Sequence, residues 1–208
     1  MVNNFLDANI FLELTVDESD YGEFCDKIFE GAYDRTATNR ILIEVDRIKK
    51  IILNIFDKLI IFYTKNRSMD HFFSNVKISE RKMDRIRDID KWVTEYHGGS
   101  KVLRLNWLKS EFEKTVSYRL TTLNLGLIPE STDNDLCQEV NLLTLNVDDA
   151  WHITDAYSWS CSNGLTLMWS IDNDVIGPRE AILTTICRKK GISRALCNFD
   201  IKHIKDII

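Results

Sequence analysis

The sequence predicts an α/β fold built around a parallel sheet. Short apolar runs alternate with longer segments whose apolar residues recur at helical spacing, and strands that alternate with helices indicate a parallel sheet. Residues 165–169 form a continuous apolar run, as expected of a strand that is buried on both faces. The chain has 208 residues, which fits one domain or one domain with an insertion.

Four short extended segments are expected from the apolar runs. The first of them ends at Asp7, and a turn over residues 170–174 follows the third. The four segments are residues 2–6, 142–145, 165–169 and 195–197.

Helical periodicity predicts five helices after residue 38. The clearest begins at Asn39, because apolar residues recur at steps of three and four from Ile41 to Phe62. Pro178 occupies the favoured first-turn position of the last helix. The predicted ranges are residues 39–65, 80–96, 108–123, 148–160 and 178–190.

The net charge of −5 hides an uneven distribution along the chain. Residues 40–120 contain 18 Lys and Arg against 11 Asp and Glu, whereas the rest of the chain contains 9 against 21. Attraction to phosphate depends on local charge more than on the total, so the basic middle favours contact with nucleic acid. A set of solvated helix faces is an equally good interpretation, because charge runs usually have that role.

Cysteine usage and hydropathy bear on the cellular compartment. The five cysteines are odd in number and scattered, so neither a disulfide framework nor a zinc cluster is supported. No apolar run reaches the roughly 18 residues that a membrane-spanning helix needs. A cytoplasmic protein with reduced thiols and no membrane segment is therefore expected.

Two acidic residues lie just beyond predicted strands. Asp7 follows residues 2–6, and Asp172 follows residues 165–169. In open parallel sheets, ligands bind beyond the carboxyl ends of the strands. Two carboxylates at that edge create an anionic pocket, and like charges held so close are costly unless a cation lies between them.

Helical geometry places two more acids beside buried faces. At about 100° per residue, Glu44 falls about 60° from the centre of the apolar stripe of its helix. Asp149 lies in the first turn of the helix after Val147, at the edge of its apolar face. Taken alone, Asp149 could equally be an acid that the helix macrodipole favours. Convergence of four acids on one pocket favours a metal site.

Four short motifs resemble those of PIN-domain nucleases. Residues 5–11, Phe-Leu-Asp-Ala-Asn-Ile-Phe, resemble the opening signature, an Asp followed by a small residue and a Ser or Asn. Residues 38–47, with Glu44, resemble the segment that carries the second acid. Residues 149–156 resemble the third motif, an Asp followed by a His-Ile pair, and residues 170–174 resemble the fourth, a Ser-x-Asp turn after an apolar strand.

The resemblance covers about residues 2–65 and 140–200 and implies a three-layer α/β/α sandwich. Small PIN domains have a much shorter segment between the second and third acids. The chain is therefore expected to be a single PIN-like domain over residues 1–208, with a helical, basic insertion at about residues 66–138.

The same resemblance implies a metal-dependent nuclease that hydrolyses phosphodiester bonds, with RNA as the expected substrate. Carboxylate oxygens suit Mg²⁺ and Mn²⁺. Asp7 and Asp172 are expected as primary ligands and Asp149 as a ligand directly or through water. Glu44 is expected to orient a water on the metal.

Other residues are expected around these four acids. Three candidates support the ligands from behind, and four basic residues of one short helix are candidates for phosphate contact. His152 lies off the apolar stripe of its helix, where a packing or hydrogen-bonding role is favoured over a catalytic one. The supporting candidates are Asn9, Ser170 and Asp174, the last of which is slightly favoured as a turn residue instead, and the basic candidates are Arg81, Lys82, Arg85 and Arg87.

Three alternatives to this interpretation stay open. A PIN-like module could bind RNA or protein without cutting, or the chain could be a toxin paired with an antitoxin. A phosphatase is the third, although Asn9 stands where the haloacid-dehalogenase type has its second Asp. A homodimer is also open, since PIN domains often dimerise.

Overall fold

The computed structural model describes residues 2–13, 21–31, 33–65, 80–95, 100–121 and 125–207, apart from the side chains of residues 80–85 and of Trp92. The chain divides into two compact units. The first combines Met1–Asp46 with Thr115–Ile208, and the second is Arg47–Lys114.

The first unit contains a five-stranded sheet in which each neighbouring pair of strands is parallel. The strand order is β3-β2-β1-β4-β5, so β1 lies at the centre. The strands are β1 (Asn3–Leu6), β2 (Arg35–Ala37), β3 (Leu125–Leu127), β4 (Thr166–Ser170) and β5 (Phe199–His203). The predicted α/β fold with a parallel sheet is confirmed.

The central strand β1 is buried on both of its faces. Phe5 and Leu6 are fully buried, and successive side chains of a strand point to opposite faces. Phe5 pairs with Thr36 of β2 on one side and with Met168 of β4 on the other. Helices must therefore cover the sheet on both sides, an arrangement compatible with a three-layer sandwich.

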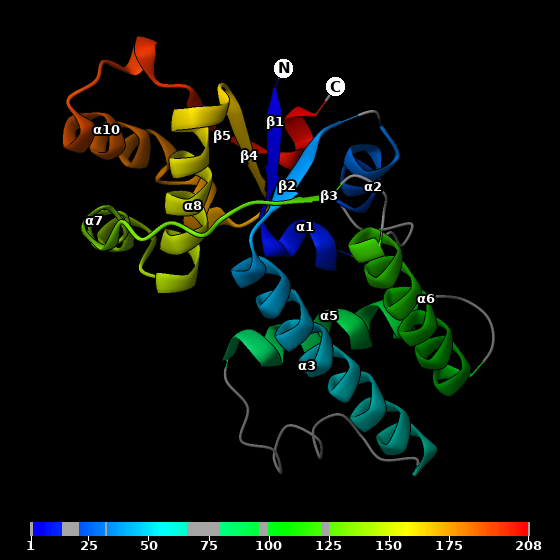
Figure 1. The fold of residues 1–208 in the computed structure, drawn as a ribbon. Helices are drawn as coiled ribbons and strands as arrows, with labels where there is room; N and C mark the ends of the chain where they lie inside the picture. Colours follow the sequence, from blue (N-terminus) through cyan, green and yellow to red (C-terminus); the bar gives the residue numbers. More distant parts are fainter. Residues whose placement is uncertain are drawn as a thin grey trace. The chain divides into compact units, whose positions relative to one another are not determined.

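Helices of the first unit lie on both sides of the sheet (Figure 1). One group, α7, α8 and α10, packs together on one side, where α8 contacts β4 and β5, and α2 lies on the other side. These and the shorter elements are α1 (Ala8–Leu12), α2 (Gly22–Glu30), α7 (Asn134–Thr144), α8 (Val147–Asn163), α9 (Asn173–Ile176), α10 (Arg179–Lys190), η1 (Arg194–Leu196) and η2 (Ile204–Asp206).

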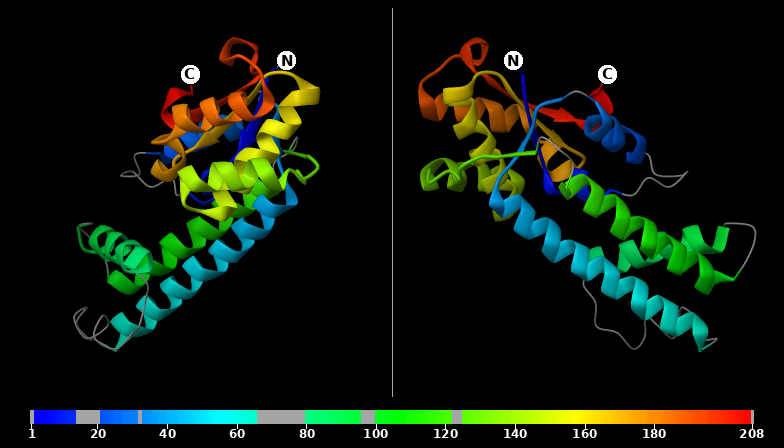
Figure 2. Two further views of the ribbon diagram at one scale, coloured as in Figure 1. Left: turned by 90° about the vertical axis from the view of Figure 1, so that its left-hand side faces the viewer. Right: turned by 45° about the vertical axis from the view of Figure 1, so that its right-hand side comes forward.

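The second unit is helical, and α3 (Asn39–Thr64), α5 (Glu80–Glu95) and α6 (Lys101–Thr121) contribute to it (Figure 2). The rings of Phe56 on α3 and Phe112 on α6 pack with centroids 6.3 Å apart. Lys109 of α6 pairs with Asp57 of α3 at 2.7 Å. Tyr63 donates a hydrogen bond to Asp90 of α5. Apolar packing and a few polar contacts thus join the three helices.

Two of the predicted extended segments are wrong. Residues 142–145 belong to the end of α7 and its cap, because Asp133 accepts a hydrogen bond from the Leu136 N–H and begins a helix there. Residues 195–197 fall in η1 and its cap, and the strand follows at β5.

The remaining differences concern short strands and boundaries. The strands β2 and β3 were not predicted, and the helix expected from residue 108 begins at Lys101. The compact helical unit spans Arg47–Lys114, and α7 packs against α8 and α10 in the first unit. The single domain with an insertion at about residues 66–138 stays a prediction. The expected PIN-like identity of the fold stays a prediction.

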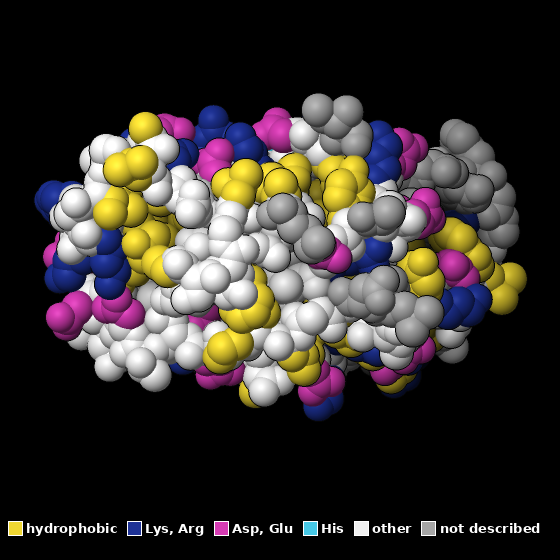
Figure 3. Space-filling model, turned by 45° about the horizontal axis from the view of Figure 1, so that its top comes forward, with side chains coloured by type: hydrophobic (Ala, Val, Ile, Leu, Met, Phe, Trp, Pro, Cys, Tyr) yellow, Lys and Arg dark blue, Asp and Glu magenta, His cyan; other side chains and the backbone are white. Residues whose placement is uncertain are grey.

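Surface charge is mixed on the face drawn in Figure 3, where Lys and Arg side chains are interspersed with Asp and Glu side chains. Exposed ion pairs of this kind join Arg188 to Glu139 and Lys114 to Glu111. Among the described helices, none is long and apolar enough to cross a bilayer.

Candidate metal centre

The candidate site lies where the direction of chain winding changes in the sheet. From β1 the chain passes to β2 and β3 on one side, and it later returns to β4 on the other side of β1. Ligands of open parallel sheets bind at such a switch point, beyond the carboxyl ends of the strands. Asp7 directly follows β1, and Asp172 follows Ser170, the last residue of β4.

Asp7 is a buried carboxylate that several groups hold in place. Its side chain begins α1 by accepting a hydrogen bond from the Ala8 N–H at 2.7 Å, and Ser170 Oγ donates to its other oxygen at 2.7 Å. Burial alone would raise the pKa of Asp7, but the hydrogen bond and charge of His152 outweigh it, with help from Ser170, and hold that pKa below its usual value. Asp7 is therefore ionised at neutral pH.

Asp149 is a buried acid of the site whose ionised form is disfavoured by its surroundings. It lies in the first turn of α8, is 5% exposed, and accepts a hydrogen bond from Asn146 Nδ2 at 2.8 Å. Burial, and then the nearby carboxylates of Asp7 and Asp172, raise the pKa of Asp149 to about 7. Such a carboxylate gains much from a cation beside it.

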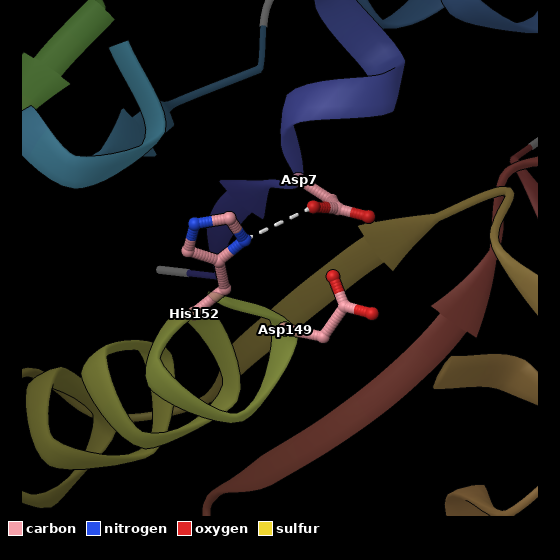
Figure 4. Close-up of side chains that lie close together, drawn as sticks. All are labelled: Asp7, Asp149 and His152. Carbon is pink, nitrogen blue, oxygen red and sulfur yellow. Dashed lines mark hydrogen bonds and ion pairs between the residues drawn. The ribbon is translucent and has the colours of Figure 1, made fainter. Parts of the chain in front are cut away.

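His152 lies between Asp7 and Glu44, and Figure 4 shows its contact with Asp7. Its Nδ1 is 3.3 Å from Asp7 Oδ1, and its Nε2 is 3.3 Å from Glu44 Oε2. Burial lowers the pKa of His152, yet the hydrogen bond to Asp7 and the charges of Asp7 and Glu44 hold it above its usual value. His152 thus has the hydrogen-bonding role that was one of the two favoured from sequence, and its partner Asp7 makes it part of the acidic site.

Helical spacing is the signal that places His152 here. Asp149 and His152 are three residues apart in α8, and residues at that spacing lie on the same helix face. Asn146 was also absent from the expected site, although its side chain both caps α8 at the Asp148 N–H and donates to Asp149. An Asn just before a helix is a recognisable capping signal.

A polar cluster holds the first turn of α3 against α8 and so sets the position of Glu44. Arg40 lies one helical turn before Glu44, and its guanidinium carbon is 4.0 Å from the centre of the Trp151 ring. Arg40 also pairs with Glu130 at 3.0 Å. The fully buried Asp155 of α8 accepts a hydrogen bond from the backbone N–H of Ser131, the residue that follows Glu130.

The expected supporting residues connect Asp172 to the rest of the site. Ser170 Oγ accepts a hydrogen bond from the Asp172 N–H at 3.0 Å while donating to Asp7. Asn9 Nδ2 lies 3.4 Å from Asp172 Oδ2. Asp172 begins α9 by accepting from the Asp174 N–H, so Asp174 contributes its backbone, and its own side chain is exposed.

The basic candidates of α5 lie in the second unit. The side chains of Arg81, Lys82 and Arg85 lie outside the described residues, whereas Arg87 is described and exposed. Their predicted contact with phosphate therefore stays a prediction.

One group of ligand atoms in the described residues meets the geometric requirement for a shared metal ion. One ligand atom each from Asp7, Asp149 and His152 lie within 4.8 Å of one another. Of the four acids predicted from sequence, Asp7 and Asp149 belong to this group. The other two lie beside it: Glu44 is next to His152, and Asp172 contacts Asn9 and Ser170. The group combines two carboxylates with one imidazole, a donor set that can hold a divalent cation.

Comparison with known proteins identifies no relative. The chain matches no protein-family model, no curated protein and no solved structure.

Proposed function

We propose that this chain is a PIN-like, metal-dependent nuclease that hydrolyses phosphodiester bonds, with RNA as its substrate. The observation that carries the proposal is the convergence of Asp7, Asp149 and His152 at the carboxyl edge of β1 and β4, with Glu44 and Asp172 beside them. A parallel sheet places its ligand site at this edge. The three-layer sandwich and the helical insertion belong to the same proposal.

The residues at this edge fit a divalent cation. Asp7 offers an ionised oxygen whose position is fixed by Ala8 and Ser170. Asp149 is held at a pKa of about 7 by burial and by neighbouring acids, so a cation beside it would relieve the repulsion. Mg²⁺ and Mn²⁺ bind through a few carboxylates and keep several waters, which suits the mixed and incomplete donor set here.

The chain's own residues would divide the work of hydrolysis. Asp7 and Asp149 would hold the ion, and Asp172 would bind it directly or through water. A bound divalent ion supplies Lewis-acid activation of water and of the phosphate. Glu44, whose side chain is 15% exposed, lies beside His152 and would orient the attacking water.

The charge distribution supports a nucleic-acid substrate, and the resemblance to PIN-domain nucleases is what names RNA. The first unit supplies the acids of the site, whereas residues 40–120 carry the excess of Lys and Arg. Basic side chains there would neutralise backbone phosphates and supply affinity that does not depend on sequence.

Cleavage of a mixed panel of labelled RNA and DNA tests the proposal. The protein would be assayed with Mn²⁺, with Mg²⁺ and with a chelator, beside Asp7→Asn. We expect cutting of RNA that needs the metal and that Asp7→Asn reduces by at least about a hundredfold. A protein that binds RNA but cuts nothing with either metal would instead be a non-catalytic binding module, and cutting that survives in Asp7→Asn would place the reaction elsewhere.

A further inference from the structure

Both ring nitrogens of His152 face carboxylate oxygens at the same distance. Nδ1 lies 3.3 Å from Asp7, and Nε2 lies 3.3 Å from Glu44. We propose that His152 Nδ1 is itself a metal ligand beside Asp7 and Asp149, that Glu44 accepts the proton on Nε2, and that the site therefore prefers Mn²⁺ to Mg²⁺. This inference rests on the proposed function and deepens it by naming a nitrogen ligand and by ordering the two candidate ions.

The spacing of the three ligand atoms fits a single ion. With bonds of about 2.1 Å, adjacent ligands of an octahedral ion lie about 3 Å apart and opposite ligands about 4.2 Å apart. The 3.3 Å between His152 Nδ1 and Asp7 Oδ1 is close to the adjacent value. The ligand atoms of Asp7, Asp149 and His152 all lie within 4.8 Å of one another, so small side-chain rotations would bring the Asp149 oxygen onto the same ion.

Glu44 is placed to act through His152. It does not join the group of described ligand atoms that lie within 4.8 Å of one another, but its Oε2 faces the ring nitrogen that points away from Asp7. A histidine that binds a metal through one nitrogen usually donates the other N–H to a carboxylate, which fixes the ring and its tautomer. Glu44 is thus a positioning residue that acts through His152, a role additional to the orientation of water expected from sequence.

The nitrogen ligand carries the metal preference. Mg²⁺ demands oxygen ligands and keeps its waters, whereas imidazole binds first-row transition ions well. Mn²⁺ accepts carboxylate oxygen and imidazole nitrogen together. A site of two carboxylates and one imidazole on buried side chains would therefore bind Mn²⁺ more tightly than Mg²⁺.

Electron spin-echo spectroscopy of the Mn²⁺-loaded protein tests ligation directly. A coordinated imidazole nitrogen modulates the Mn²⁺ echo, and a carboxylate does not. We expect nitrogen modulation in the native protein and its loss in His152→Gln. The matched control is His203→Gln, because His203 lies on β5, and its Nδ1 accepts the Lys205 N–H. That variant should keep the modulation.

Metal titration by calorimetry separates the roles of His152 and Glu44. Removing Glu44 as Glu44→Ala should weaken Mn²⁺ binding about 10- to 100-fold while nitrogen modulation persists, as expected when an outer carboxylate is lost. His152→Gln should remove the preference for Mn²⁺ over Mg²⁺. Circular dichroism of each variant would establish that it is folded.

The outcomes distinguish this inference from the proposed function. Mn²⁺ that binds without nitrogen modulation, or Mg²⁺ that binds as tightly as Mn²⁺, would overturn the inference and leave a nuclease with oxygen ligands intact. In that case His152 would serve only as a charged partner of Asp7 and Glu44. Absence of binding by either ion would overturn both.

Discussion

At the scale of single residues, the site concentrates negative charge in a buried place. Asp7 and Asp172 both raise the pKa of Asp149, and His152 is the basic group that faces Asp7 and Glu44. Such repulsion lowers the stability of the metal-free protein. Sites that bind cations commonly accept this cost, because the ion returns the free energy on binding.

The pH dependence of stability should reveal Asp149. Its pKa rises from 3.8 to about 7 on folding, so the folded state holds the proton more tightly than the unfolded state. In chelator, the free energy of unfolding contributed by this group is present below pH 3.8 and is lost as the pH rises through 7. Asp149→Asn removes this dependence on pH. As the pH rises from 3.8 to 7, the free energy of unfolding of the variant should therefore increase relative to that of the native protein, by about 4 kcal/mol at most.

Urea denaturation of both proteins at several pH values between 4 and 8 measures this difference. Curves that stay parallel over the whole range would mean that Asp149 is not destabilised by its neighbours. Saturating Mn²⁺ should shrink the difference, because the ion stabilises only the ionised carboxylate of the native protein.

Single residues also show what sequence could and could not predict. Asp7 and Asp172 were predictable because each follows an apolar strand that the central sheet requires. Asp149 was predictable from its place at a helix start. Helical spacing could place His152 on the same face of its helix as Asp149, but a histidine at a helix edge has many uses, and only the packing of α8 beside β4 brings its ring between Asp7 and Glu44.

At the scale of elements, long helices were predictable and short strands were not. The apolar stripe of α3 extends over many turns, whereas β2 and β3 have three residues each, too few for a periodic pattern. Residues 142–145 form a short, mainly apolar run, which periodicity alone cannot assign to a strand or a helix, and they end α7, which packs against α8 and α10.

The junction between α7 and α8 carries a testable strain. Leu145 caps α7 with φ of 55°, in the left-handed region, and its side chain is 87% exposed. A residue with a Cβ loses about 1 kcal/mol there, whereas glycine does not. Leu145→Gly should therefore raise the free energy of unfolding by about 0.5 to 1 kcal/mol in urea denaturation.

Leu142→Gly is the matched control for that change. Leu142 is 76% exposed but lies inside α7, so glycine there should cost about 1 kcal/mol. Opposite signs for the two substitutions are expected. Destabilisation by both would show that the cap conformation of Leu145 is not the limiting strain.

Arg119 joins the end of α6 to the helix that begins at Asp7. Its fully buried guanidinium donates to backbone carbonyls at the end of α1, including that of Ile10 at 3.1 Å, and pairs with Asp26 of α2 at 2.8 Å. Arg119→Met would leave these acceptors without their donor. We expect it to lower the free energy of unfolding by about 3 kcal/mol or more.

Lys114→Met on the same helix provides the comparison for Arg119. Lys114 pairs with Glu111, and its side chain is 68% exposed. Exposed ion pairs contribute about 0 to 1 kcal/mol to the free energy of unfolding. Equal effects of the two substitutions in urea denaturation would mean that Arg119 does not anchor α1.

At the scale of the whole molecule, the acids of the candidate site and most of the basic middle of the sequence fall in different compact units. The acids of the candidate site belong to the first unit, and Arg87 belongs to the helical second unit. The logarithm of affinity for RNA should fall linearly with the logarithm of salt concentration if basic side chains contact phosphates. Arg87→Gln should reduce that slope by about 0.7 for single-stranded RNA.

RNA binding measured in chelator, where cleavage is blocked, gives this slope without loss of substrate. Arg188→Gln serves as the control, because Arg188 is 70% exposed on α10 of the first unit and pairs with Glu139. A slope that Arg87→Gln and Arg188→Gln leave equally unchanged would mean that Arg87 is only a solvated residue of a helix face.

The most direct test of the account compares two neighbouring acids in one assay. Asp148 and Asp149 both lie in the first turn of α8 and feel the same helix dipole, but only Asp149 belongs to the candidate metal centre. RNA cleavage with Mn²⁺ should fall by at least about a hundredfold in Asp149→Asn and stay near the native rate in Asp148→Asn. Equal rates in the two variants would contradict a metal-dependent nuclease built on this site.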